Sequence, residues 1–340
     1  LITSSNKNNH NFEADIIIGT HALFQQKVTF ENIGLVVIDE QHKFGVHQRI
    51  LLNEKAGNSC DILLMTATPI PRTMELAAYG DMDISKISEK PKNRKEIITK
   101  SINISKIDQL KESLTKILNK KQKIYWVCPL IDESEKLQLQ SVNSRVNDLK
   151  KYYSSNNVGL VHGQMSQEEK NGVMSKFKDN KIDILVATSV IEVGIDDPDA
   201  TVMIIENSER YGLSQLHQLR GRVGRGNVQS TCILLFEGPL TDNAKRRLKV
   251  MKETNDGFLI AEEDLDIRGA GEILGSKQSG IPNFRLSNLD KHKHILEEAR
   301  GVAMDIVKED PDLKKSAGKA QRTLLHLFRN QVAIDYLKTG

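Results

Sequence analysis

The sequence predicts an α/β protein whose parallel sheets are covered by helices on both faces. Short apolar runs, such as LVVI at 35–38 and VGLV at 158–161, have the pattern of buried strands. Between residues 96 and 240 such runs alternate with stretches of helical pattern, an order typical of parallel sheets. A length of 340 residues is enough for about two domains with cores of their own.

Composition and charge exclude several classes of protein. Hydrophobic content of 39% and charged content of 27% are ordinary for a soluble globular chain, and no apolar run approaches the ~20 residues of a membrane span. The net charge of +3 permits binding to nucleic acid without demonstrating it. Cys60, Cys128 and Cys232 have neither zinc nor disulfide spacing, so we expect reduced core thiols in a cytosolic protein.

Three strands are predicted in the first 95 residues, at Asp15–Ile18, Leu35–Ile38 and Asp61–Met65. The first is followed by GTHALF at Gly19–Phe24. A strand, then Gly-Thr, then the start of a helix can hold a phosphate through backbone amides and a hydroxyl group. An ordinary strand-to-helix turn is an equally good interpretation of this segment.

The second strand ends in two carboxylates, Asp39 and Glu40, followed by Gln41 and His42. The carboxyl ends of strands are where open α/β sheets bind ligands. Asp39 is suited to hold Mg²⁺, often across a water, and Glu40 to polarise a water that attacks a phosphoanhydride. Gln41 and His42 are suited to sense the γ-phosphate or a neighbouring domain. If the apolar strand were followed by Asp-Glu alone, the alternative would be a charged strand end that faces solvent and has no function.

The third strand leads into TATPIPRT at Thr66–Thr73. Thr66 and Thr68, together with two prolines, predict a stiff turn lined by hydroxyl groups, which could pass movement from one site to another. A loop stabilised only by its prolines is the alternative. The polar, basic stretch Lys90–Lys95 predicts the interdomain linker.

Residues 96–240 carry the strand and helix alternation of a second sheet. We expect helices at 106–119, 142–153 and 167–177. We expect strands at 123–130, 158–161, 182–187, 201–205 and 231–236. The strand at 158–161 ends in HGQM, which begins at His162.

The strand at 182–187 ends in TSVIEVGIDDPDA. Because Thr188 follows the strand directly, its hydroxyl group can reach a backbone phosphate. Gly194 and Asp196 lie in the loop just beyond. The alternative for Asp196 and Asp197 is that each is a helix cap or a turn acid.

The stretch QLHQLRGRVGRG at Gln215–Gly226 holds three arginines among glycines. Because three guanidinium groups cannot be hidden without partners, we expect no buried helix here. Arg222 and Arg225 are three positions apart, so on one helical turn they would share a face. Two rigid forks of donors suit a phosphate chain. A solvated basic turn on nucleic acid is the alternative.

Taken together and in this order, GTHALF, IDEQH, TATPIPRT, HGQM, ATSVIEVGID and QLHQLRGRVGRG resemble a superfamily 2 helicase motor over residues 15 to 285. Within the superfamily the chain resembles the RecG family of branched-DNA motors, on IDEQHKFGVHQR at 38–49 and ERYGLSQLHQLRGRVGRG at 209–226. Residues 246–280 are similar to the translocation motif that RecG shares with the transcription-repair coupling factor Mfd. NDGF at 255–258 and the short tail favour RecG.

The resemblance implies a fold of two RecA-like helicase lobes, the first incomplete, followed by a helical hairpin and C-terminal helices. The expected parts are the end of the first lobe at 1–94, the second lobe at 95–240, the translocation-motif hairpin at 241–285 and a helical tail at 286–340. In the tail, amphipathic patterns predict helices around 289–308 and 313–337.

The resemblance also implies roles for single residues. Catalysis is assigned to Asp39 (with Mg²⁺ through water), Glu40, Gln218, Arg222 and Arg225, with Gln218 and Arg222 facing the γ-phosphate and Arg225 as arginine finger. Coupling between ATP and movement is assigned to His42, Thr66, Thr68, Gly194 and Asp196. Contact with DNA is assigned to Thr20, His21 and Thr188, and polar positions of the translocation motif to Arg247, Arg268 and Gln278.

The implied function is an ATP-dependent DNA helicase that translocates on double-stranded DNA and remodels forks and Holliday junctions in recombination and repair. ATP and Mg²⁺ are the implied cofactors. Branched double-stranded DNA is the implied partner, with single-stranded-DNA-binding protein as a second one. The implied protein is a monomer in the bacterial cytoplasm, associated with the nucleoid.

The sequence departs from the family in one respect, since it contains no GxxxxGK followed by Ser or Thr. RecG proteins should carry that loop after a wedge domain, upstream of what begins here at Leu1. We therefore expect an incomplete first lobe and a chain that is inactive alone. The alternatives are a non-catalytic remnant, a DNA-binding fragment, or an Mfd-like translocase. An in-frame GxGKT encoded upstream would indicate a piece of an active motor.

Overall fold

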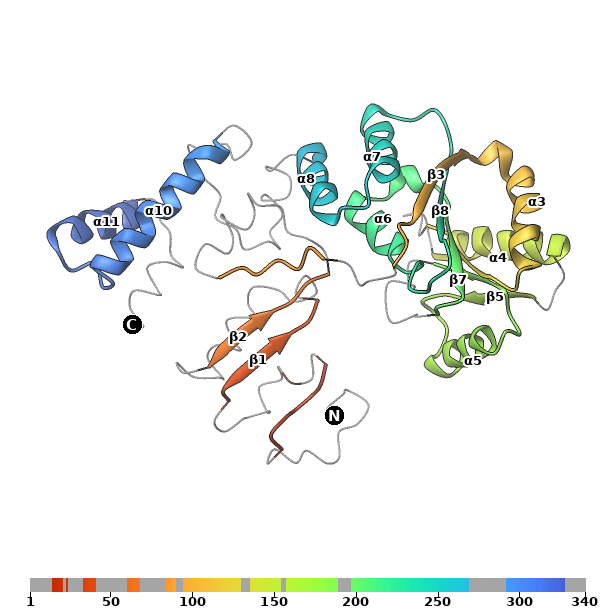
Figure 1. Ribbon diagram of the computed structural model, residues 1–340, viewed down its shortest axis with the longest axis horizontal. Coiled ribbons are helices and arrows are strands. Elements are labelled where there is room, and N and C mark those ends of the chain that lie inside the picture. Colours follow the sequence, from red (N-terminus) through yellow and green to blue (C-terminus); the bar gives the residue numbers. More distant parts are fainter. Residues whose placement is uncertain are drawn as a thin grey trace. The chain divides into compact units, whose positions relative to one another are not determined.

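The computed structural model describes residues 14–20, 23, 33–40, 60–67, 83–89, 94–129, 135–153, 157–188, 197–268 and 292–327. The chain divides into two compact units, one formed by Leu1–Asp83 with Arg268–Gly340, and the other by Ile84–Ile267 (Figure 1). None of the described helices is long and apolar enough to cross a membrane.

The first unit contains a two-stranded parallel sheet, as predicted for the second and third apolar runs. Strand β1 (Leu35–Ile38) pairs with β2 (Asp61–Leu64) so that Ile38 lies opposite Leu64. Two strands alone bury little: Ile38 is 4% exposed, whereas Leu35 remains 58% exposed.

The strand predicted at Asp15–Ile18 is wrong. Residues 16–18 are outside any strand, with Ile16 79% and Ile18 64% exposed, and only Gly19 forms an isolated bridge. A β-branched run favours extended backbone, but a strand also needs a hydrogen-bonded neighbour, and side-chain burial supplies most of its stability.

The structure has two helices within the ranges predicted for the tail, α10 (Lys293–Glu309) and α11 (Ser316–Leu327). Residues 289–291 and 328–337 of the predicted helices lie outside the described residues. Asp310 ends the first helix and shapes the turn, because its buried carboxylate accepts hydrogen bonds from the backbone N–H groups of Lys314 (2.9 Å) and Lys315 (2.7 Å).

The second unit is built on a parallel sheet of six strands in the order β3-β8-β7-β4-β6-β5. The strands are β3 (Ile98–Asn103), β4 (Lys123–Val127), β5 (Val158–Val161), β6 (Ile184–Ala187), β7 (Ala200–Ile205) and β8 (Thr231–Phe236). The helices are α3 (Ile107–Leu118, after the 3₁₀ turn η3 at Ile104–Lys106), α4 (Glu135–Tyr153), α5 (Gln167–Lys178), α6 (Leu213–Arg220, after η6 at Ser208–Arg210), α7 (Asp242–Glu253) and α8 (Gly257–Arg268).

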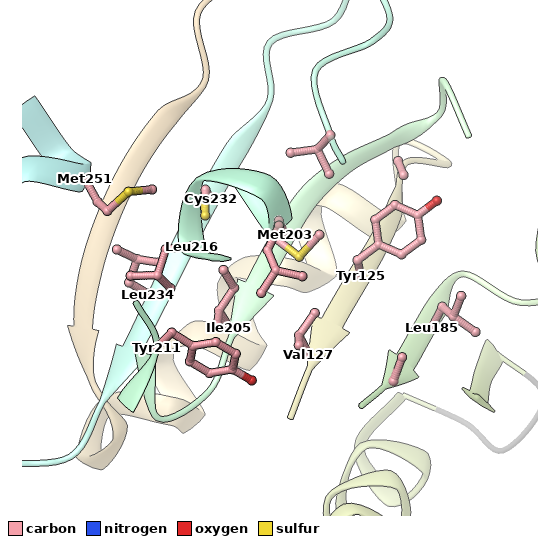
Figure 2. Close-up of a cluster of buried hydrophobic side chains, with 14 of the residues drawn as sticks. Tyr125, Val127, Leu185, Met203, Ile205, Tyr211, Leu216, Cys232, Leu234 and Met251 are labelled. Atoms are coloured by element: carbon pink, nitrogen blue, oxygen red, sulfur yellow. The ribbon is translucent and has the colours of Figure 1, made fainter. Parts of the chain in front are cut away.

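Both faces of the six-stranded sheet are buried, which explains why its strands have continuous apolar runs. Side chains alternate between the faces: Tyr125 and Val127 of β4 point to one core and Trp126 to the other. Helices α3 and α4 cover the Trp126 face, and α5 to α8 cover the opposite one. Figure 2 shows the core on the Tyr125 face of the sheet, to which Tyr125, Met203, Leu216, Leu234 and Met251 belong.

Helices α7 and α8 form the hairpin predicted for the translocation motif. The turn 254–256 joins them, and Arg246 near the start of α7 forms an ion pair with Glu263 near the end of α8 (2.7 Å), so the helices run antiparallel. Leu248, Met251 and Ile260 belong to the core of the sheet. The hairpin is therefore packed onto the second lobe.

Candidate functional site

The first group of candidate residues lies at the carboxyl ends of β1 and β2. Asp39 and Glu40 follow β1, and the Glu40 N–H donates to Asp39 Oδ1 (2.8 Å). Glu40 has a left-handed backbone with a φ of 52°. Thr66 follows β2, where the Met65 N–H donates to the Ile38 carbonyl (2.8 Å). Parallel pairing thus brings these three residues to one edge of the sheet.

The carboxylate of Asp39 fits the predicted contact with Mg²⁺. It is exposed, and carboxylate oxygens that leave room for several waters are the usual magnesium ligands. No group of three or more His, Cys, Asp or Glu side chains within the described ranges could form a closed metal site. Among the described residues, a Mg²⁺ ion here would be held by few protein atoms.

Some predicted site residues fall outside the described residues, namely His21, His42, Thr68, Gly194, Asp196 and Gln278. Thr20 is described and is exposed, and its carbonyl accepts a hydrogen bond from the Leu23 N–H (3.0 Å). Arg268 is the last residue of α8 and is exposed.

A second group lies where β5 and β6 end side by side, because Val161 pairs with Ala187. The next residues are His162 and Thr188, and the Thr188 N–H donates to the Val161 carbonyl (3.3 Å). Thr188 is 3% exposed, yet within the part of the chain that the structure describes its hydroxyl oxygen and His162 Nδ1 have no hydrogen-bond partner. Because a buried polar atom without a partner is costly, these two atoms are suited to a ligand.

The third group is the arginine stretch, where one prediction was wrong. Gln215–Arg220 belongs to helix α6, which is partly buried, with Arg220 only 2% exposed. The Arg220 guanidinium has hydrogen-bond partners in the core, because its Nη1 donates to the carbonyls of Met251 (2.9 Å) and Thr254 (2.8 Å). These carbonyls end α7, a position where a cation is favoured.

The expectation that Arg222 and Arg225 share a helical face is also wrong, because α6 ends at Arg220 and both arginines lie in the following loop. Val223 is fully buried and anchors that loop. Gly224 has a φ of 78°, and a Cβ there would lie 2.9 Å from Ile97 Cγ1. Close packing on Ile97 and a positive φ both require glycine. Gln218 is half-buried on α6.

The hairpin holds helix α6 at both ends. At its start, Asp264 of α8 accepts hydrogen bonds from the Leu213 N–H (3.3 Å) and the Ser214 hydroxyl (2.8 Å). At its end, Arg220 binds the carbonyls that terminate α7. Just before α6, Nη2 of Arg247 donates to the Glu209 carbonyl (2.7 Å). The arginine stretch and the hairpin therefore form one packed assembly.

Two of these contacts were missed by sequence reasoning. Asp264 is one acid in the polar run EEDLD, and no local signal distinguishes it from its neighbours. Arg220 was noticed only as one of three arginines. Its partners Met251 and Thr254 lie more than 30 positions away, at separations of 31 and 34.

Two cysteines are core thiols, as predicted. Cys128 and Cys232 are buried and free of disulfides, and Cys60 is free but half-buried. Burial raises the pKa of Cys128 well above its ordinary value, and the neighbouring Glu206 raises it further. Burial raises the pKa of Cys232 to about 12. Both thiols are therefore unreactive at neutral pH.

Three family models match the chain. They are described as "DEAD/DEAH box helicase" over residues 2–77, "Helicase conserved C-terminal domain" over 105–227, and "ATP-dependent DNA helicase RecG, domain 3, C-terminal" over 254–332. The three segments follow one another and cover both units.

Curated relatives are similar over most of the chain. The ATP-dependent DNA helicase RecG of Haemophilus influenzae is 48% identical over 305 residues, covering 88% of this chain and 44% of the relative. The RecG of Streptococcus pneumoniae is 48% identical over 311 residues, covering 90% of this chain and 46% of the relative. The chain thus spans less than half the length of the curated relatives it matches.

Among solved structures, RecG bound to a three-way DNA junction superposes with a TM-score of 0.62 at 44% identity, covering 83% of this chain and 36% of that one. Saccharomyces cerevisiae Dbp5 bound to RNA and ADP BeF3 superposes with a TM-score of 0.51 at 15% identity, covering 88% and 73%. At that identity the second likeness concerns the fold alone, that of RecA-like helicase lobes.

Proposed function

Because the chain belongs to the RecG family of helicases, we propose that it is a motor segment in which ATP hydrolysis drives translocation on double-stranded DNA and remodelling of branched DNA. One observation supports this most strongly. Helix α6, which we call the arginine helix because it ends at Arg220, is hydrogen-bonded to the α7–α8 hairpin at both ends, through Asp264 and Arg220. A motor needs such a link between the nucleotide and an element that moves DNA.

At the nucleotide, Asp39 would hold Mg²⁺, with water completing the contact, and Glu40 would polarise the attacking water. Their position at the carboxyl end of a parallel strand supports these roles. Gln218 and Arg222 face the γ-phosphate, and Arg225 is the arginine finger that stabilises developing charge. Mg²⁺, when bound, neutralises charge on the phosphates. Arg225 is exposed, whereas Arg220 is buried.

On DNA, Thr188 and Thr20 contact the phosphate backbone. The buried hydroxyl of Thr188, which has no partner among the described residues, and the neighbouring His162 Nδ1 support a ligand at the ends of β5 and β6. The junction-bound RecG structure supports branched DNA as the substrate. We further propose that the protein is a monomer in the bacterial cytoplasm, associated with the nucleoid. Single-stranded-DNA-binding protein is proposed as a further partner.

Movement passes from α6 to the hairpin. When ATP binding shifts the arginine loop, α6 carries Arg220 and its N-terminal end with it, and the hairpin must follow. Arg247 lies on α7 and Arg268 on α8. In this proposal their side chains transmit movement through polar contacts and do not bind the nucleotide. Thr66 transmits the state of the first lobe in the same way.

A DNA-binding segment without catalysis is the second candidate function. The observation that favours it is the absence of GxxxxGK followed by Ser or Thr, whose amides and lysine hold the β- and γ-phosphates in related motors. In that case the phosphate contacts at Thr188 remain, and the carboxylates of the first lobe have no nucleotide to act on.

Fork unwinding by a fusion protein separates the two functions. The part of the Haemophilus influenzae relative that precedes the matched region is joined to this chain, and unwinding of a three-way junction is followed with ATP. We expect unwinding that requires hydrolysable ATP and is lost in Glu40→Gln. Junction binding with no unwinding in any nucleotide would favour the DNA-binding segment.

A further inference from the structure

A small cavity of about 140 Å³ lies beside the C-terminal end of α6, within the second unit. It is lined by His217 and Arg220 of α6 and by Arg94, Lys95 and Glu96, which precede β3. About 10–15 Å³ of such space holds one water, so this cavity has room for a small polyatomic ligand.

The guanidinium of Arg220 forms the wall of this cavity and carries a buried charge that its contacts offset only in part. All its partners are neutral: two carbonyls at the end of α7, the Thr99 hydroxyl (3.3 Å), and His217 Nδ1 (2.9 Å). The end of a helix offsets about half an elementary charge. Burial lowers the pKa of Arg220, and the nearby Cys232 thiol is the group that opposes the shift, with no carboxylate involved.

Arg94 and Lys95 add two cations to the lining of the cavity, with donors available to a ligand. Arg94 is exposed and uses its Nε, which donates to the Gly224 carbonyl (3.0 Å). The Nη groups of Arg94 and the ammonium of Lys95 make no hydrogen bond or ion pair with any part of the chain that the structure describes. Since an arginine can only donate, the hydrogen bond from Arg220 to His217 Nδ1 leaves the ring proton of His217 on Nε2. Glu96, which is exposed, is the carboxylate among the residues that line the cavity.

We propose that this cavity binds a phosphate-type oxyanion, held by Arg94 and Lys95 with the buried charge of Arg220 behind them. Arginine forks and lysine ammonium groups are the side chains that bind phosphate oxygens best. The oxyanion is either inorganic phosphate or a nucleotide phosphate from solution, or a phosphate of the DNA backbone. The cavity is distinct from Thr188, which lies at the ends of β5 and β6 and does not line it.

Thermal unfolding of the 340-residue chain tests the site without any activity. Midpoints are compared in millimolar inorganic phosphate and in chloride of equal ionic strength. We expect phosphate to raise the midpoint, because a ligand that binds only the folded chain stabilises it. The double variant Arg94→Gln with Lys95→Gln should weaken the apparent phosphate affinity about tenfold or more, and Glu96→Gln should strengthen it.

The matched control is Lys116→Gln with Lys120→Gln, which removes two exposed positive charges at the end of α3. This control should keep the full response to phosphate. An equal response in the control and in the Arg94/Lys95 variant would overturn the proposal, since phosphate also stabilises proteins by exclusion from their surface. No response in the unaltered chain would overturn it as well.

Fluorescence anisotropy with a short DNA duplex then separates the two sources of the oxyanion. If the Arg94/Lys95 variant loses duplex affinity and inorganic phosphate competes with the duplex, the ligand is a backbone phosphate. If duplex affinity is unchanged while the response to phosphate is lost, the ligand is a free phosphate or a nucleotide.

Discussion

Arg220 and Arg225 are five positions apart and have different surroundings. Arg220 is 2% exposed and bound to carbonyls, whereas Arg225 is exposed in the loop that Val223 anchors. A guanidinium that already caps a helix cannot reach for a ligand. The exposed arginine can be aimed at charge that develops during a reaction.

In the fusion protein, Arg225→Ala should reduce DNA-stimulated ATP turnover by about 10³ to 10⁵, the range measured for arginine fingers. Nucleotide binding should be nearly unchanged, because the finger acts mainly on the transition state. Steady-state turnover and binding of a fluorescent ATP analogue are the measurements. A loss of turnover below about tenfold would mean that Arg225 is only a surface charge.

A buried ion pair supports the second lobe. Lys123 Nζ lies 2.7 Å from Asp197 Oδ2, with the two side chains 1% and 5% exposed. We expect Lys123→Met to lower the free energy of unfolding by about 3–5 kcal/mol, because Asp197 is left buried without its cation. Urea unfolding followed by the fluorescence of Trp126, the only tryptophan, measures this loss.

The control for that experiment is Lys123→Met combined with Asp197→Leu, which removes both charges. It should recover most of the lost stability, since replacing a whole buried pair by apolar groups is often neutral. Equal losses in the single and double variants would show that the lysine stem, and not the charge pair, stabilises this region.

The cysteines report on the same core. At pH 8 and without denaturant, iodoacetamide should modify Cys60 faster than Cys128 and Cys232, because burial raises the pKa of both of the latter thiols and removes them from the reagent. Peptide mass spectrometry after timed quenching gives the three rates. Rapid modification of Cys232 would contradict its place in the core.

Helix α6 depends on another element for its N-terminal cap. Its own N-cap is Gly212, which has no side chain to accept a hydrogen bond, and Asp264 of α8 takes over this task. The hairpin therefore stabilises the start of the arginine helix in addition to packing beside it.

Asp264→Ala should lower the free energy of unfolding by about 1–2 kcal/mol, the usual cost of losing a helix cap. In the fusion protein it should reduce junction unwinding more than ATP turnover, since it loosens the link without touching the nucleotide. Arg246→Ala is the control: its ion pair with Glu263 is half-exposed, and its loss should cost at most about 1 kcal/mol. Equal reductions of unwinding and turnover in Asp264→Ala would argue against coupling through the hairpin.

The elements that could be predicted are those whose own residues carry the signal. The strands at 158–161 and 231–236 have the predicted limits, because each is a complete apolar run. Strand β3, ITKSIN, was missed because Lys100 and Ser101 interrupt its apolar pattern. Helix α6 was missed because the burial of Arg220 depends on carbonyls at residues 251 and 254.

Some features of the candidate site could likewise be predicted from local sequence, and others could not. Motif order supplied the candidate residues, and parallel pairing of β1 with β2 and of β5 with β6 explains how some of them come together within each unit. The grip of the hairpin on α6 and the cavity beside Arg220 arise from contacts between distant segments. No local pattern of residues 213–226 or 242–268 encodes either of them.

The central claim is that this chain supplies the carboxylates and arginines of a DNA motor but not its phosphate-binding loop. ATP turnover in the presence of a three-way junction tests it, with the 340-residue chain and the fusion protein measured side by side. We expect no turnover above background from the chain, and junction-stimulated turnover from the fusion that Glu40→Gln abolishes. Robust turnover by the chain alone that disappears in Glu40→Gln would contradict the claim, as would a folded fusion that binds the junction and leaves ATP intact.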